Sequence, residues 1–144
     1  MNTNAFPIDK DFLALFFAWL VALVATLGAL FIGEILGQKP CMLCWYQRIA
    51  MFPLALILGI ACLRNDRSIR VYVTPVAIVG ATIALWHSLV YFGVAPTAIE
   101  PCGQGPSCQG ADMTLFGSLP LPVLSLGAFA AIILLLSNSV RIPK

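Results

Sequence analysis

Charged residues are scarce in this chain of 144 residues: they make up 10% of the sequence, whereas hydrophobic residues make up 60%. Soluble domains are about one quarter charged, and the mean hydropathy here is +0.96, so the composition excludes an ordinary soluble domain. There is no dense basic patch of the kind that binds nucleic acid, no fixed-period repeat, no low-complexity tract and no loop long enough for a separate domain. We therefore expect residues 1–144 to form a single domain of an integral membrane protein.

Four apolar stretches are long enough to cross a membrane. The first, residues 12–32, contains no charged residue, and at about 1.5 Å per residue it matches a hydrocarbon core about 30 Å thick. Further stretches cover residues 45–63, 71–94 and 119–136. The first is longer than the apolar region of a signal peptide and no convincing cleavage motif follows it, so we expect it to be retained. The sequence predicts an all-α membrane protein, a bundle of four transmembrane helices.

Lysine and arginine are distributed unevenly between the segments that flank these spans. Six of the eight lie in the amino-terminal tail, the middle loop or the carboxyl-terminal tail, namely Lys10, Arg64, Arg67, Arg70, Arg141 and Lys144. The positive-inside rule predicts that these segments, and hence both termini, are cytoplasmic. The outer loops are then residues 33–44 and 95–118, and the formal charge of +2 follows from this asymmetry.

The cysteines are sorted in the same way. Cys41 and Cys44 fall in the first outer loop, Cys102 and Cys108 in the second, and only Cys62 lies near the inner end of a span. Disulfides form and persist outside the cytoplasm, whereas cytosolic thiols stay reduced, so two outer pairs indicate dithiol chemistry. We expect Cys62 to be an inert packing residue.

The first pair opens the second span in the stretch PCMLCWYQR, residues 40–48. Unpaired N–H groups and the helix dipole at a helix start stabilise a thiolate, the nucleophile of disulfide exchange. Arg48 follows Cys44 by one helical turn, where its cation can stabilise that thiolate or the negative charge that develops on a quinone ring. The alternative is that Arg48 extends to the lipid headgroups.

The second pair lies in PCGQGPSCQG, residues 101–110, whose glycines and prolines indicate a turn-rich loop. A disulfide that closes so short a ring constrains the unfolded chain by only about 2 kcal/mol, which favours an exchangeable bond over a structural one. His87, inside the third span, either carries protons toward a quinone or is neutral and hydrogen-bonded between helices.

Taken together, these residues resemble the disulfide bond formation protein family called DsbB, and most closely its short branch, called BdbC. The resemblance covers nearly the whole chain. It includes the four spans, CMLCWYQR at residues 41–48, PCGQGPSC at residues 101–108 and LPLPVLSLGAFA at residues 119–130.

The resemblance implies a bacterial inner-membrane enzyme that reoxidises a thioredoxin-fold thiol oxidase (DsbA-like) and passes the electrons to ubiquinone or menaquinone. Carried onto this chain, Cys41 and Cys44 become the pair adjoining the quinone, Cys102 and Cys108 the pair that meets the partner, and Arg48 the quinone neighbour. The best-known members space the second pair widely, whereas here five residues separate it. Which cysteine the partner attacks first therefore stays open.

Other classes of protein fit parts of the pattern. Four cysteines in two pairs can hold a tetrahedral zinc ion, although an oxidising compartment argues against it and we expect no metal. A membrane scaffold with structural disulfides in its outer loops is another alternative. In the vitamin K epoxide reductase type, a related quinone enzyme, the quinone-side pair opens the last span rather than the second. Haem attachment is excluded, because Trp45 rather than histidine follows Cys44.

Overall fold

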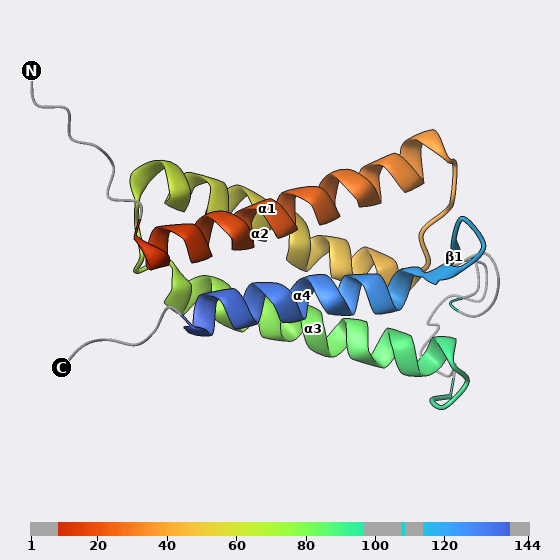
Figure 1. The fold of residues 1–144 in the computed structure, drawn as a ribbon. Coiled ribbons are helices and arrows are strands. Elements are labelled where there is room, and N and C mark those ends of the chain that lie inside the picture. The colour runs from red at the N-terminus through yellow and green to blue at the C-terminus, as the bar shows by residue number, and fades with distance from the viewer. Residues whose placement is uncertain (1–8, 97–107, 109–113, 139–144) are drawn as a thin grey trace, which may run out of the picture.

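The computed structural model describes residues 9–96, 108 and 114–138, and in it the predicted helical membrane bundle is confirmed. Its four long helices are α1 (Lys10–Leu30), α2 (Met42–Arg64), α3 (Arg70–Tyr91) and α4 (Leu121–Asn138) (Figure 1). A π-helical turn, η1 (Phe31–Ile35), extends α1. Each of the four is long and apolar enough to cross a membrane.

The helices are arranged around the bundle in chain order. Helix α1 packs against α2 and α4, and α3 packs against the same two helices. The start of α1, the connection from α2 to α3 and the end of α4 lie at one end of the bundle (Figure 1). We call this the Asp9 end, and the opposite end the hairpin end.

The Asp9 end is held together by a charged cluster. The Asp9 carboxylate caps α1 by accepting a hydrogen bond of 2.9 Å from the Phe12 backbone N–H. Arg67, between α2 and α3, pairs with both Asp9 and Asp11. The Phe12 N–H and then Arg67 lower the pKa of Asp9 below its usual value of 3.8, so the cap stays ionised at neutral pH. The cluster ties the start of α1 to the α2–α3 connection.

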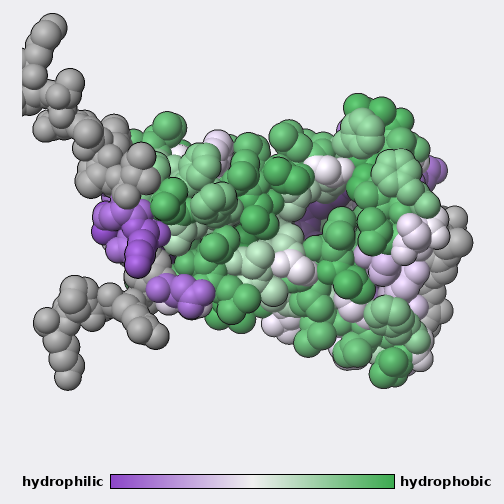
Figure 2. Space-filling view, in the orientation of Figure 1, coloured by the Kyte–Doolittle hydropathy of each residue, from purple (hydrophilic) through white to green (hydrophobic). Residues whose placement is uncertain are grey.

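The core is built from large apolar side chains that face small ones. Leu15, Leu54, Leu58, Phe129 and Ile132 are fully buried. They share the interior with buried alanines from α1, α2 and α3, which let the helix backbones approach closely. The outer surface of the bundle between its two ends, on the side shown in Figure 2, is predominantly hydrophobic. A mainly apolar exterior is what a bundle surrounded by lipid requires.

A short hairpin at the other end was not anticipated from the sequence. Strands β1 (Thr114–Leu115) and β2 (Leu119–Pro120) pair antiparallel, with Thr114 opposite Pro120 and Leu115 opposite Leu119. The chain reverses through Phe116 and Gly117, both of which have positive φ. The hairpin leads directly into α4, so it sets where that helix starts.

Candidate redox site

The cysteine pair Cys41 and Cys44 lies where α2 begins, at the hairpin end. Cys41 is the N-cap residue and Cys44 lies in the first turn, a spacing that brings both side chains to one face of the helix. The Cys41 thiol donates a hydrogen bond to the Cys44 sulfur over 3.4 Å. That hydrogen bond, followed by burial, raises the pKa of Cys41 to about 12. Cys44 is therefore the accepting sulfur of the pair.

Cys108 contacts this pair from the second loop. Cys41 and Cys108 are both buried in a small apolar cluster with Val90 and Ala95, and Cys44 packs against it. Cys108 is therefore part of the same buried cluster as Cys41. Cys102, the other predicted member of the second pair, lies outside the described residues. The structure thus brings one loop cysteine into the buried cluster that contains Cys41 and against which Cys44 packs.

His87 reaches the pair from α3. Its side chain is fully buried, with Nε2 at 3.7 Å from the Cys41 sulfur and Nδ1 at 2.9 Å from the Gln47 amide nitrogen. Because α3 ends at Tyr91, His87 lies one helical turn from the end of its helix. The predicted span, residues 71–94, placed His87 two turns from the end. The ring therefore joins α3 to the start of α2 through its contacts with Cys41 and Gln47.

Sequence reasoning gave Gln47 no role. It is buried, and its amide contacts the Nδ1 atom of His87. The only signal in the sequence is its polarity: Gln47 and Arg48 are the polar side chains in the first turns of an otherwise apolar span. Such a residue inside a membrane bundle needs a polar partner. Which residue supplies that partner is decided by the packing of α2 on α3.

Arg48 extends across to α1. Its guanidinium donates a hydrogen bond of 2.8 Å to the Ala29 carbonyl oxygen and lies 5.6 Å from the centre of the Trp45 ring. A side chain at position 33 would crowd it, since a Cβ on Gly33 would lie 3.0 Å from a guanidinium nitrogen, closer than most such contacts. The π-helical turn η1, which includes Gly33, interrupts the regular helical hydrogen bonds at this point. The absent side chain and the widened turn together make room for the cation inside the bundle.

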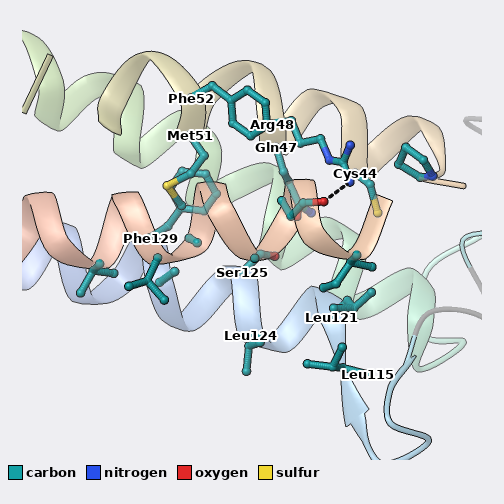
Figure 3. A pocket seen from close by; sticks show the side chains of 18 of the residues that line it. Cys44, Gln47, Arg48, Met51, Phe52, Leu115, Leu121, Leu124, Ser125 and Phe129 are labelled. Atoms are coloured by element: carbon teal, nitrogen blue, oxygen red, sulfur yellow. Dashed lines mark hydrogen bonds between the residues drawn. The ribbon is translucent and has the colours of Figure 1, made fainter. Parts of the chain in front are cut away.

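A pocket of about 540 Å³ opens between α1, α2 and α4. Cys44, Gln47 and Arg48 line one part of it, and apolar side chains such as Met51 and Phe129 line the rest (Figure 3). Figure 2 shows a hollow in the apolar flank with hydrophilic surface at its base. Its volume lies in the range of small-molecule sites.

The two sulfurs of the pair have different surroundings. Cys44 lines the pocket, and Cys41 is not among the lining residues. Instead Cys41 lies beside His87 and in one buried cluster with Cys108. The pair of Cys41 and Cys44 therefore lies between a small-molecule pocket on one side and a third cysteine, Cys108, on the other. This arrangement can transfer two electrons by disulfide exchange between sites that do not touch directly.

Known proteins resemble this chain over most of its length. The family model described as "Disulfide bond formation protein DsbB" matches residues 11–138. The "Probable disulfide formation protein" of Metapseudomonas resinovorans is 52% identical over 134 residues, covering 92% of this chain and 93% of that protein. "Disulfide bond formation protein C" of Bacillus subtilis is 46% identical over 120 residues, covering 83% and 87%. No solved structure matches the chain.

Proposed function

Because the chain belongs to the disulfide bond formation protein family DsbB, a role in disulfide bond formation is supported, and we propose the reaction that it carries out. In this proposal the protein is a quinone-dependent protein-disulfide oxidoreductase. It reoxidises a DsbA-like, thioredoxin-fold thiol oxidase and so sustains disulfide formation in exported proteins. The observation that carries the proposal is that Cys44 lines the pocket while Cys41 is buried in one cluster with Cys108.

The pocket fits a quinone. Its lining is mainly apolar, as an isoprenoid tail requires, and its polar groups are concentrated around Cys44, Gln47 and Arg48, where a ring with two carbonyl oxygens would find hydrogen-bond donors. A quinone bound there supplies an acceptor for two electrons and two protons. The Arg48 cation lies where negative charge would develop on such a ring, and its contact with Ala29 holds it in place.

The loop pair receives electrons first. A thiolate of the reduced partner attacks the Cys102–Cys108 disulfide and forms a mixed disulfide, and the partner's second thiol displaces the loop sulfur. The partner leaves oxidised, and the loop pair holds the two electrons as two thiols.

Exchange between the two pairs follows. The Cys108 sulfur attacks Cys41 of the Cys41–Cys44 disulfide, so that a Cys41–Cys108 bond forms and Cys44 is released as a thiolate. Cys102 then attacks Cys108, which re-forms the loop disulfide and leaves Cys41 with its electrons. The proposal is supported by the burial of Cys41 and Cys108 in one cluster and by Cys44, the released sulfur, lining the pocket. Cys41 leaves as a thiolate 3.7 Å from Nε2 of His87, a distance from which the ring can supply the proton that Cys41 takes up.

The proposed setting is a bacterial inner membrane. The uneven distribution of lysine and arginine supports an orientation with the Asp9 end in the cytoplasm and the cysteine pairs on the outer face. Thiol oxidation on that face is compatible with the oxidising compartment outside the membrane.

The experiment that tests the proposal follows quinone absorbance over time. Detergent-purified protein is mixed with a reduced thioredoxin-fold oxidase and either ubiquinone or menaquinone. Wild type and Cys62→Ser should reduce quinone at the same rate, whereas Cys44→Ser should be inactive, because it cannot complete the disulfide beside the pocket. Cys62 is the matched control, since it lies on the same helix far from the pair.

Two outcomes would contradict the proposal. Turnover by Cys44→Ser at the wild-type rate would show that the pair of Cys41 and Cys44 takes no part in the reaction. Silence of folded wild type with both quinones and several partners would instead favour a non-catalytic scaffold.

A further inference from the structure

Three potential metal ligands converge beside the pocket. The sulfurs of Cys41 and Cys44 and a ring nitrogen of His87 all lie within 4.8 Å of one another. Cys41 and His87 are fully buried and Cys44 is partly buried. Two elements contribute, the start of α2 and the last turn of α3. Unlike a site of four cysteines, this set of ligands combines two cysteines, Cys41 and Cys44, with one histidine.

Two of the three distances are close to those around a tetrahedral ion. With metal–sulfur bonds of about 2.3 Å and metal–nitrogen bonds of about 2.0 Å, two sulfurs around a tetrahedral zinc lie about 3.8 Å apart, and a sulfur and a nitrogen about 3.5 Å apart. The corresponding distances here are 3.4 Å between the sulfurs and 3.7 Å between the Cys41 sulfur and Nε2. The third distance, from the Cys44 sulfur to the ring nitrogen, is at most 4.8 Å, so an ion can enter if the Cys44 side chain moves by up to about 1 Å.

Gln47 lies where it can orient the histidine for metal binding. Its amide nitrogen lies 2.9 Å from Nδ1, on the opposite side of the ring from the thiols. When the amide turns over and presents its oxygen instead, it accepts the Nδ1 proton, and the lone pair of Nε2 then faces the sulfurs. A metal-bound histidine almost always donates its second ring N–H to such an acceptor.

The charges also balance. Two thiolates neutralise a divalent cation, so a buried complex of Cys41, Cys44 and His87 carries no net charge, which limits the free energy of burying it. On binding, each thiol releases its proton to solvent and His87 contributes a lone pair; no electrons move. The oxidised pair has no thiolates to offer and cannot form the complex.

We propose that the reduced form of this site binds a thiophilic divalent cation of the zinc type through the sulfurs of Cys41 and Cys44 and Nε2 of His87. The ion is an inhibitor rather than a resident cofactor. While bound, it holds both sulfurs as ligands, so that Cys41 cannot exchange with Cys108 and Cys44 cannot pass electrons into the pocket. This inhibition rests on the proposed function, whereas metal binding itself requires neither quinone nor partner.

The test uses Co²⁺ as a spectroscopic probe and Zn²⁺ as its competitor. The full chain carries Cys62→Ser, Cys102→Ser and Cys108→Ser, so that Cys41 and Cys44 are its only cysteines, and it is reduced in detergent with a phosphine. We expect one Co²⁺ per chain, with thiolate-to-cobalt absorption bands that Zn²⁺ abolishes. Protein whose pair has been oxidised should show no bands.

Substitutions distinguish the residues that bind the metal directly from Gln47, which orients His87. Cys44→Ser and His87→Gln should each weaken Co²⁺ binding by about 100-fold or more, since each removes a ligand. Gln47→Leu keeps all three ligands and should weaken binding by about 10- to 100-fold. Restoring Cys62 should change neither the affinity nor the bands. Thermal unfolding followed by circular dichroism shows which variants are folded, and only folded ones are compared.

The inference is overturned if the reduced, folded protein shows no cobalt–thiolate bands, or if His87→Gln binds Co²⁺ as tightly as its parent. A second arm adds Zn²⁺ to turning-over wild type, where quinone reduction should stop and resume after chelation. If quinone is never reduced but cobalt binds, the proposed function fails and the metal site stands. If quinone is reduced and cobalt does not bind, the metal site fails and the proposed function stands.

Discussion

At the scale of single residues, the environments of Cys41 and Cys44 differ although only two residues separate them. Cys41 is buried against Cys108 and His87, whereas Cys44 lines the pocket with Arg48. A helix start positions both side chains on one face, but the neighbours of each come from different parts of the chain. The difference divides the two tasks of the proposed reaction, exchange with another disulfide and delivery of electrons, between two sulfurs in hydrogen-bond contact.

Arg48→Met should separate these two tasks. Methionine preserves much of the apolar stem and removes the cation, so quinone reduction should fall by about 100-fold, the usual effect of losing one electrostatic stabiliser. The two disulfides stored in each oxidised enzyme should still be transferred to the reduced partner. Quinone absorbance measures the first quantity and the oxidation of a stoichiometric amount of partner measures the second.

Arg64→Met is the matched control for this prediction, because Arg64 is the exposed arginine at the other end of the same helix. It should leave both quantities at the wild-type level. An Arg48→Met enzyme with an unchanged rate of quinone reduction would assign the guanidinium to structure alone.

At the scale of elements, close contacts between helices depend on glycines. Gly33 leaves room for the Arg48 guanidinium beside η1, and Gly80 of α3 lies against the Phe129 ring of α4. A Cβ at position 80 would come within 2.2 Å of a ring carbon. Phe129 also lines the pocket, so the separation of α3 and α4 affects the shape of the site.

Gly80→Ala should therefore destabilise the bundle by about 1–3 kcal/mol, the usual effect of overpacking a core. The added methyl group must push the Phe129 ring or the whole of α4 aside. The thermal unfolding midpoint in detergent measures the effect. Combining Gly80→Ala with Phe129→Leu should recover part of the loss, because the smaller side chain vacates the space.

Gly127→Ala, on α4, is the control for this substitution. Nothing lies within 4 Å of a Cβ at that position, so alanine should be neutral or should stabilise the helix by up to about 1 kcal/mol. Equal unfolding midpoints for the two alanine variants would show that the α3–α4 contact tolerates the extra volume.

At the scale of the whole molecule, the two ends of the bundle differ in chemistry. The Asp9 end carries the described ion pairs, in which Arg67 binds Asp9 and Asp11. The hairpin end carries Cys41, Cys44 and Cys108 with their apolar cluster. If the basic segments are cytoplasmic, the redox chemistry takes place on the opposite face of the membrane.

Cysteine labelling in intact cells tests this orientation. In a chain whose five native cysteines are replaced by serine, Phe116→Cys places a thiol at the exposed tip of the hairpin and Ser68→Cys places one between α2 and α3. A membrane-impermeant maleimide should label Phe116→Cys in intact cells and Ser68→Cys only after permeabilisation. The opposite pattern would reverse the orientation derived from the lysine and arginine distribution.

The sequence by itself determined the class of fold, because four apolar stretches of spanning length leave the backbone no way to satisfy its hydrogen bonds except as helices. It also determined that Cys41 and Cys44 lie at the start of a helix, since their spacing and the apolar run that follows are local features. The motifs around both cysteine pairs were enough to predict the family.

Only the tertiary structure decided what these residues contact. Arg48 meets Ala29 from 19 residues away, and Gln47 and Cys41 meet His87 from 40 and 46 residues away. No local pattern encodes such pairs, because they depend on how α1, α2 and α3 rotate and pack to bury Leu54, Phe129 and their neighbours. The pocket has the same origin: it is the space that this packing leaves between α1, α2 and α4.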